Sequence, residues 1–305
     1  MVYCAGARHG CMPRRRQPAI AGVMDPLVFA AVLVAAACHA GWNAAVKKGL
    51  DPLATTVAIT VGSSVVAALL VPFVGLPPAR AWPWVVASVL IHVVYFAALI
   101  ESYRAGDMGQ VYPIARGSAP LLTAGASAAL IGETIGLAAW IGIVLLAGGV
   151  LLLSLRGGRD LARIDRRAVG FALFTALTIC VYSLVDGTGA RVSGDAHSYT
   201  AAMFLGNGIA VAAYGLFRRG PAAFGGLARH WPIGLFGGTL SLVSYGIVIW
   251  AMTVAPIAIV AALRETSVLF ATLIAVVVLR EPLRAVRLVA AVVIVIGVAL
   301  IRLQP

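Results

Sequence analysis

Two long apolar stretches of the chain resemble each other: residues 111–136, VYPIARGSAPLLTAGASAALIGETIG, and residues 259–284, IVAALRETSVLFATLIAVVVLREPLR. An offset of 148 positions pairs an arginine, a glutamate and, a little further on, a glycine: Arg116 with Arg264, Glu133 with Glu281, and Gly149 with Gly297. Self-similarity at one fixed offset indicates an internal repeat. The chain is therefore predicted to consist of two similar halves.

The composition of the whole chain is typical of a membrane protein. Of its 305 residues, 61% are hydrophobic and 11% are charged, whereas soluble domains average roughly 45–50% apolar and about 25% charged residues. This excludes a soluble enzyme. A membrane span needs ~20 apolar residues, and ten apolar runs of about that length lie at 27–46, 53–75, 82–101, 109–131, 135–155, 168–186, 199–217, 232–252, 255–279 and 286–302.

The repeat and the apolar runs together predict the fold class. They indicate an all-α polytopic membrane protein with ten transmembrane helices, arranged as two five-helix repeats. Because each repeat has an odd number of spans, the second enters the membrane in the opposite orientation, so the repeats are inverted. We place the first repeat at 25–156, a linker at 157–167 and the second repeat at 168–305. Inverted repeats are the plan of secondary transporters, whose substrate site lies near the bilayer midplane.

An N-terminal extension, residues 1–24, belongs to neither repeat. Arg14, Arg15 and Arg16 are followed by no apolar segment of the length that a signal peptide requires. Met24 opens directly into the first apolar run. We therefore expect translation to start at Met24, with the preceding residues either disordered or the result of a misplaced start.

Polar side chains within the apolar runs are the candidate site residues. Arg116 lies ~10 Å and Arg264 ~14 Å into its span at 1.5 Å per residue, and a central arginine that faced lipid would cost roughly 2.5–3.5 kcal/mol. Both must face the protein interior, either to bind substrate or to pair with acidic residues. Further residues are predicted to line the site with them: His39, Trp42, Asn43, Tyr95, Tyr112, Tyr182, Asp186 and Tyr245.

Two acidic residues within the spans are candidates for proton coupling. Glu265 follows Arg264, which places it ~100° further around the helix, facing Arg116 or a neighbouring helix. Burial can move a carboxylate toward its neutral form. We therefore expect Glu265, ahead of Asp186 and His39, to bind a proton during a driven transport cycle.

Glutamates and prolines near the paired spans have predicted structural roles. Glu133 and Glu281 each precede a predicted helix, where a carboxylate would cap the N-terminus of the helix that follows. Pro113 and Pro120 lie seven residues apart in the fourth span and are expected to bend it. The fourth span should then be more easily deformed than its partner, the ninth.

These residues carry a family resemblance over roughly residues 25–303. The chain resembles the EamA-type transporters of the drug/metabolite transporter superfamily in the following segments: His39-Ala-Gly-Trp-Asn43 with Lys47-Lys48, Tyr112-Pro-Ile-Ala-Arg116-Gly-Ser-Ala-Pro120 with Glu133, Tyr182 with Asp186, and Arg264-Glu-Thr-Ser267 with Arg280-Glu281. The resemblance implies a ten-helix carrier, commonly an exporter of amino acids or other small metabolites.

The leading hypothesis is a secondary transporter that exports a small polar metabolite, an amino acid or another solute with an anionic group, by alternating access. The alternatives are a membrane-embedded enzyme and a non-transporting assembly or sensor subunit. The sequence contains no zinc-protease, hydrolase or P-loop motif, and we expect no metal and no cofactor. The expected partners are the substrate and the lipid bilayer, with a homodimer left open.

Charge predicts location and orientation. The net charge of +12 could suggest nucleic acid, but the arginines flank apolar runs, so we expect no nucleic acid and a topological role instead. With a start at Met24, the loops on the side of the termini hold only Arg80, Arg191 and Arg302. The positive-inside rule then places both termini outside a multi-pass protein of the bacterial cytoplasmic (inner) membrane.

Overall fold

The computed structural model describes residues 24–46, 52–105, 108–153, 165–225, 227–277, 280 and 285–303, and these residues form helices without any strand. The helices are α1 (Pro26–Val46), α2 (Pro52–Val74), α3 (Trp82–Ala105), α4 (Met108–Ala126), α5 (Leu137–Leu152), α6 (Arg166–Ser193), α7 (Ala196–Arg219), α8 (Leu227–Val254), α9 (Ile257–Arg264), α10 (Ser267–Val277) and α11 (Ala285–Arg302). Short turns of other helix types are η1 (Ala79–Ala81), η2 (Ser127–Ile131) and η5 (Gly220–Phe224).

Most of these helices are long and apolar enough to cross a bilayer. Eight helical segments of the described chain meet that standard, and two shorter apolar helices, Pro26–Gly41 and Leu137–Leu152, accompany them. Large apolar side chains such as Phe73 and Phe217 are more than four-fifths exposed. A surface of this kind is stable only against lipid.

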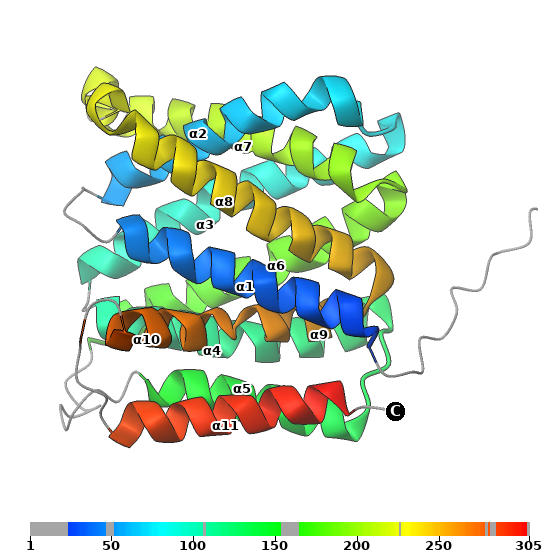
Figure 1. Ribbon diagram of the computed structural model, residues 1–305. Coiled ribbons are helices and arrows are strands. Elements are labelled where there is room, and N and C mark those ends of the chain that lie inside the picture. Colours follow the sequence, from blue (N-terminus) through cyan, green and yellow to red (C-terminus); the bar gives the residue numbers. More distant parts are fainter. Residues whose placement is uncertain are drawn as a thin grey trace, which may run out of the picture.

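Contacts between the two halves occur in matched pairs, since α1, α2 and α3 correspond to α6, α7 and α8 in the repeat. Helix α3 packs on α6, and the corresponding helices α8 and α1 also pack on each other. In the same way α2 packs on α8, and α7 packs on α3. Helices α5 and α11, which correspond to each other, form a pair at the edge of the bundle (Figure 1). Each of these contacts between the halves therefore has a counterpart in which the halves have changed places.

The edge pair α5 and α11 depends on small residues. A Cβ atom added at Gly142 would lie 2.6 Å from the backbone oxygen of Gly297, and one added at Gly297 would lie 2.7 Å from the backbone oxygen of Gly142. Only glycine permits this approach. Because the hydrophobic effect does not favour contact between helices in lipid, close van der Waals packing of this kind stabilises the pair instead.

The ninth span is interrupted, which differs from the prediction of one helix over 255–279. Helix α9 ends at Arg264 and α10 begins at Ser267. Between them the N–H of Glu265 bonds to the carbonyl of Ala262. The hydroxyl of Thr266 also donates to the Leu263 carbonyl, at 2.7 Å. These i to i−3 bonds tighten the chain into a turn without glycine or proline.

Pro113 and Pro120 do not interrupt the fourth span. Helix α4 continues through both prolines to Ala126 and then passes into the π-helical turn η2. The expectation that the fourth span deforms more easily than the ninth stays a prediction.

Two other boundaries differ from prediction. Helix α6 continues to Ser193, beyond the apolar run that ends at 186, and Gly187, Gly189, Ala190 and Ser193 in this extension are buried inside the bundle. Helix α8 begins at Leu227, so Pro232 lies inside the helix and not in its first turn. The third span does begin at Trp82, as predicted from the Trp-Pro pair.

Candidate functional site

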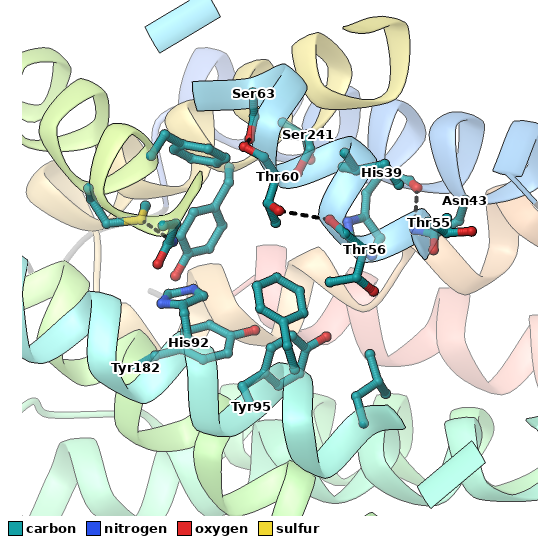
Figure 2. Close-up of a pocket in the computed structure, with 18 of the residues that line it drawn as sticks. His39, Asn43, Thr55, Thr56, Thr60, Ser63, His92, Tyr95, Tyr182 and Ser241 are labelled. Atoms are coloured by element: carbon teal, nitrogen blue, oxygen red, sulfur yellow. Dashed lines mark hydrogen bonds between the residues drawn. The ribbon is translucent and has the colours of Figure 1, made fainter. Parts of the chain in front are cut away.

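A cavity of about 320 Å³ lies between the two halves, and residues of α1, α2, α3, α4, α6, α7, α8 and α9 line it. Two opposite walls differ in chemistry (Figure 2): hydroxyl side chains of α2, such as Thr56 and Thr60, face aromatic side chains of α3 and α6, such as His92 and Tyr182. The full lining is His39, Asn43, Thr55, Thr56, Ile59, Thr60, Ser63, His92, Tyr95, Phe96, Leu99, Ile100, Tyr112, Arg116, Tyr182, Met203, Phe204, Asn207, Ser241, Ser244, Tyr245 and Arg264.

Arg116 is held by acidic and hydroxyl partners across the repeat interface. Its Nε lies 2.7 Å from Oε2 of Glu265, a charge contact whose N–H is not aligned for a hydrogen bond. Its Nη2 donates to the Ser267 hydroxyl at 3.4 Å. The break in the ninth span therefore brings Glu265 and Ser267 to Arg116, and the predicted contact of Glu265 with Arg116 is present.

Arg264 has weaker partners although it is equally buried. Its Nη2 donates to the Tyr182 hydroxyl at 3.2 Å and lies 3.8 Å from Oε1 of Glu265. The guanidinium carbon lies 5.7 Å from the ring centroid of Tyr182 and 5.8 Å from that of Tyr245. Its Nε has no hydrogen-bond partner, and only 4% of the residue is exposed. A buried charged donor without a partner is costly, and an acceptor brought to this nitrogen would remove that cost.

The position of Arg264 suits a cation. It is the last residue of α9, all eight residues of which are buried. A helix C-terminus carries partial negative charge, which stabilises a positive side chain there. The helix end and the two rings together explain how the guanidinium remains charged in the interior.

The aromatic wall is a connected set of rings. His92 stacks on Tyr182 with centroids 4.5 Å apart, and Tyr95 meets Tyr182 edge to face at 5.5 Å. The Nδ1 atom of His92 lies 2.9 Å from the Ser88 carbonyl, which fixes the imidazole ring. A rigid surface of this kind offers both ring faces and ring edges to a bound molecule.

Asp186 lies behind this wall and is completely buried. Its carboxylate accepts hydrogen bonds from the hydroxyls of Tyr245 at 2.5 Å and Tyr199 at 3.1 Å. Tyr245 lines the cavity, whereas Asp186 does not. This is a correction to the prediction that Asp186 lines the site, and its cause is that the tyrosine hydroxyls enclose the carboxylate.

The end of the bundle that carries the C-terminus is closed by an ion pair. Arg191 and Glu133 lie 2.8 Å apart, with one-tenth to one-fifth of each side chain exposed. Glu133 also accepts the backbone N–H of Ile257 at 2.9 Å, at the first turn of α9. Arg191 donates to the carbonyls of Met252 and Ala255 at 2.8 and 2.9 Å. We call Glu133, Arg191 and the start of α9 the latch.

The latch corrects one predicted role. Glu133 was expected to cap the helix that follows it, but its carboxylate caps α9, which is 124 positions further on. Helix α5 begins at Leu137 without such a cap. A carboxylate favours any nearby helix N-terminus, and the fold brings that of α9 closest. Glu281, its repeat partner, lies outside the described residues.

The other predicted site residues are mostly brought together. Six of them line the cavity with the two arginines: His39, Asn43, Tyr95, Tyr112, Tyr182 and Tyr245. The amide of Asn43 is partly occupied, since it donates to the His39 carbonyl at 2.7 Å. Trp42 lies in α1, but its side chain is outside the part of the chain that the structure describes.

Several residues were not anticipated. The hydroxyl wall on α2 and Asn207 on α7 line the cavity, and both Thr55 Oγ1 and Asn207 Oδ1 lack hydrogen-bond partners. A spacing of threonines and serines along one face of 55–63 was the available signal. Arg191 was used only for orientation, because nothing in its sequence neighbourhood points to Glu133.

Together, a multi-helix membrane bundle with a polar cavity between two related halves defines a membrane transport protein as the class. Comparison with known families gives the particular member: the model of the EamA-like transporter family matches residues 27–155 and again 166–303, and the chain belongs to that family. No curated protein matches the chain.

Comparison with solved structures supports the fold. One of them, titled "Crystal structure of protein", has a TM-score of 0.68 and 22% sequence identity, with 92% of this chain and 98% of that chain covered. At this identity the likeness concerns the fold alone. The protein is therefore a multi-pass membrane transporter of the drug/metabolite transporter superfamily.

Proposed function

We propose that the protein exports a small metabolite with an anionic group by alternating access. The observation that carries this proposal is Arg264: it lines the cavity, is 4% exposed, and in the described structure its ion-pair contact with Glu265 is 3.8 Å long. Guanidinium groups bind carboxylates through paired N–H donors. Such a donor in a cavity between two halves is suited to hold an anion at the centre of the membrane.

Inverted repeats support the mechanism. The matched pairs of contacts between the halves are those expected when a two-fold axis relates the two repeats. With five spans in each half, the second repeat would have the opposite orientation in the membrane. Interrupted helices that end near a midplane site recur in transporters of this plan, and α9 ends at Arg264 beside the cavity. Movement of one half against the other would then open the site to each side in turn.

The latch supports an assignment of the closed side. It joins the ends of α6 and α8 to the start of α9, on the side of the C-terminus. The cavity lining instead extends toward the end of α1 and the start of α2, at Asn43 and Thr55. If the termini lie outside the bacterial cytoplasmic membrane, as the arginines suggest, this state receives substrate from the cytoplasm. Export follows when the latch opens.

Asp186 is the better candidate for proton coupling. Glu265 lies 2.7 Å from Arg116 and 3.8 Å from Arg264, so proton exchange at Glu265 would disturb its contacts with two cations. Asp186 has only hydroxyl donors at hydrogen-bond distance in the described structure. Tyr245 touches both Asp186 and the cavity, so it can pass a proton between them. We propose this route in place of Glu265.

The test is flux through purified protein. An export screen in a deletion strain would identify the solutes, and counterflow of a labelled solute would then be measured in proteoliposomes. We expect counterflow without chemical change of the solute, its loss in Arg264→Gln, and its retention in Arg167→Gln, which changes an exposed arginine of α6. Chemical turnover, or counterflow that is unaffected in Arg264→Gln, would contradict the proposal.

A further inference from the structure

The structure points to a specific class of substrate within the proposed function, on which this inference rests. We infer that the cavity binds a carboxylate with a flat aromatic body and without an ammonium group. The argument uses the charges that face the cavity, those that lie behind its walls, and the position of the rings.

The charge balance favours a single negative charge. Arg116 is already matched by Glu265 at 2.7 Å. Arg264 shares the same carboxylate only at 3.8 Å, so it is the cation whose charge is least compensated. A carboxylate supplies one charge and two oxygens for one guanidinium, whereas a doubly charged phosphate would leave one charge buried without a partner.

Among the described residues, the walls offer an ammonium ion only neutral groups, such as Asn207 Oδ1 and the ring faces, and no negatively charged partner. Among the described residues that line the cavity there are two guanidiniums and two imidazoles, and no carboxylate. Glu265 lies against Arg116, and Asp186 is enclosed by Tyr199 and Tyr245. A substrate ammonium would be buried beside Arg264 without a counterion, which is unfavourable. The site therefore selects against amines and against amino acids.

The rings select the body of the substrate. The ring of Tyr182 stacks on His92 and also lies near the guanidinium of Arg264. These contacts hold the aromatic rings next to Arg264, the expected anion site. Tyr95, Phe96 and Phe204 also line the cavity, and ring-to-ring contacts favour an aromatic partner over a saturated one. The volume of about 320 Å³ is at the lower end for small-molecule sites and suits one ring.

Four commercially available probes of similar shape separate these features. The measured quantity is binding to the purified full-length protein in nanodiscs by calorimetry. The expected ligand is 3-phenylpropionate. Phenylalanine adds an ammonium group to it, and 2-phenylethylamine has the ammonium but no carboxylate. The fourth probe, 3-cyclohexylpropionate, keeps the carboxylate and has a saturated ring. We expect 3-phenylpropionate to bind at least about tenfold more tightly than each of the other three.

Variants of Arg264 test whether this residue binds the carboxylate, and a variant of an exposed arginine is the control. In Arg264→Gln, binding of 3-phenylpropionate should fall at least about tenfold, and Arg264→Lys should bind more weakly than the wild type because it lacks the planar fork. The matched control Arg167→Gln should bind as the wild type does. If Arg264→Gln does not fold, the wild-type probe series still decides the question.

Each result has one meaning. Equal or tighter binding of phenylalanine overturns the exclusion of ammonium while the anion exporter of the proposed function stands. Equal binding of 3-cyclohexylpropionate overturns the aromatic requirement in the same way. Tightest binding of 2-phenylethylamine overturns both this inference and the proposed function. No binding of any probe at millimolar concentration overturns the substrate class alone, since counterflow of another anion tests the function separately.

Discussion

Arg116 and Arg264 occupy equivalent positions in the two repeats, yet the structure surrounds them differently. Arg116 lies within the continuous helix α4 and contacts Glu265 and Ser267. Arg264 ends the short helix α9, donates to the Tyr182 hydroxyl and lies 3.8 Å from Glu265. The interruption of one span and not the other causes this difference, because it moves Glu265 to the arginine of the opposite repeat.

The comparison shows that two copies of one motif can have different roles. One copy neutralises the charge of the cavity region and joins the halves, and the other copy remains available to an anion. Sequence symmetry therefore does not imply equal function, and each prediction below tests one part of this difference.

The largest effects are expected from removing the two arginines. Arg116→Ala leaves Glu265 buried without its 2.7 Å partner, which should lower stability by about 3–5 kcal/mol. Arg264→Ala should leave the protein folded but reduce transport at least about 30-fold, because a lost buried charge contact costs about 2–5 kcal/mol. Thermal unfolding in detergent and proteoliposome flux would measure the two effects. The opposite pattern, with Arg264→Ala unfolded and Arg116→Ala folded, would reverse the roles.

The two buried carboxylates are expected to differ in coupling. Asp186→Asn should lower the dependence of transport on a pH gradient roughly tenfold, which corresponds to about 1.4 kcal/mol. Glu265→Gln should retain that dependence in whatever fraction folds, since Glu265 pairs with Arg116. Flux at several imposed pH gradients, normalised to folded protein, compares them. Loss of the dependence in Glu265→Gln alone would restore Glu265 as the coupling residue.

The latch is expected to limit access to the start of the ninth span. Glu133→Gln removes the ion pair with Arg191 and should raise labelling of a cysteine placed at Ala258 several-fold, because Ala258 is buried in the first turn of α9. A membrane-impermeant maleimide on a cysteine-free background gives the measurement. Glu101→Gln is the control, since it removes the exposed ion pairs with Arg104 and Arg218. Equal labelling in both variants would show that the latch does not limit opening.

The smallest effect is expected at a local cap. Asp195 accepts the N–H groups of His197 and Ser198 at the start of α7. Partial burial opposes ionisation, but these bonds outweigh it and hold the pKa of Asp195 below its usual value. Asp195→Ala should cost about 1 kcal/mol.

The same cap has a predicted pH dependence. Since the folded pKa is lower than the unfolded one, the stabilisation is present at neutral pH and is lost as pH falls through the folded pKa. Asp195→Asn keeps the cap acceptor without the charge, so its stability should lack this pH dependence. Thermal unfolding between neutral and acidic pH compares the variants. An unchanged slope in Asp195→Asn would remove the role of the charge.

Local patterns allowed much of the site to be anticipated. The burial of Arg116 and Arg264 follows from the cost of charge in lipid. For Glu265, the ~100° step between adjacent helical residues left Arg116 and a neighbouring helix as the two alternatives. Contacts between distant segments could not be anticipated in this way. Asp186 with Tyr245, and Glu133 with Ile257, each join helices that only the packed bundle brings together.

The amino-acid sequence by itself determined the spans, the two halves and the need for the polar side chains to face inward, since these depend on hydrophobicity, periodicity and the energy of charges in lipid. The tertiary structure alone decided where the ninth span breaks, which arginine Glu265 neutralises, and which helix Glu133 caps. The physical reason is that a hydrogen bond or an ion pair acts over a few ångströms in space, and no local pattern records which helices will lie within that distance.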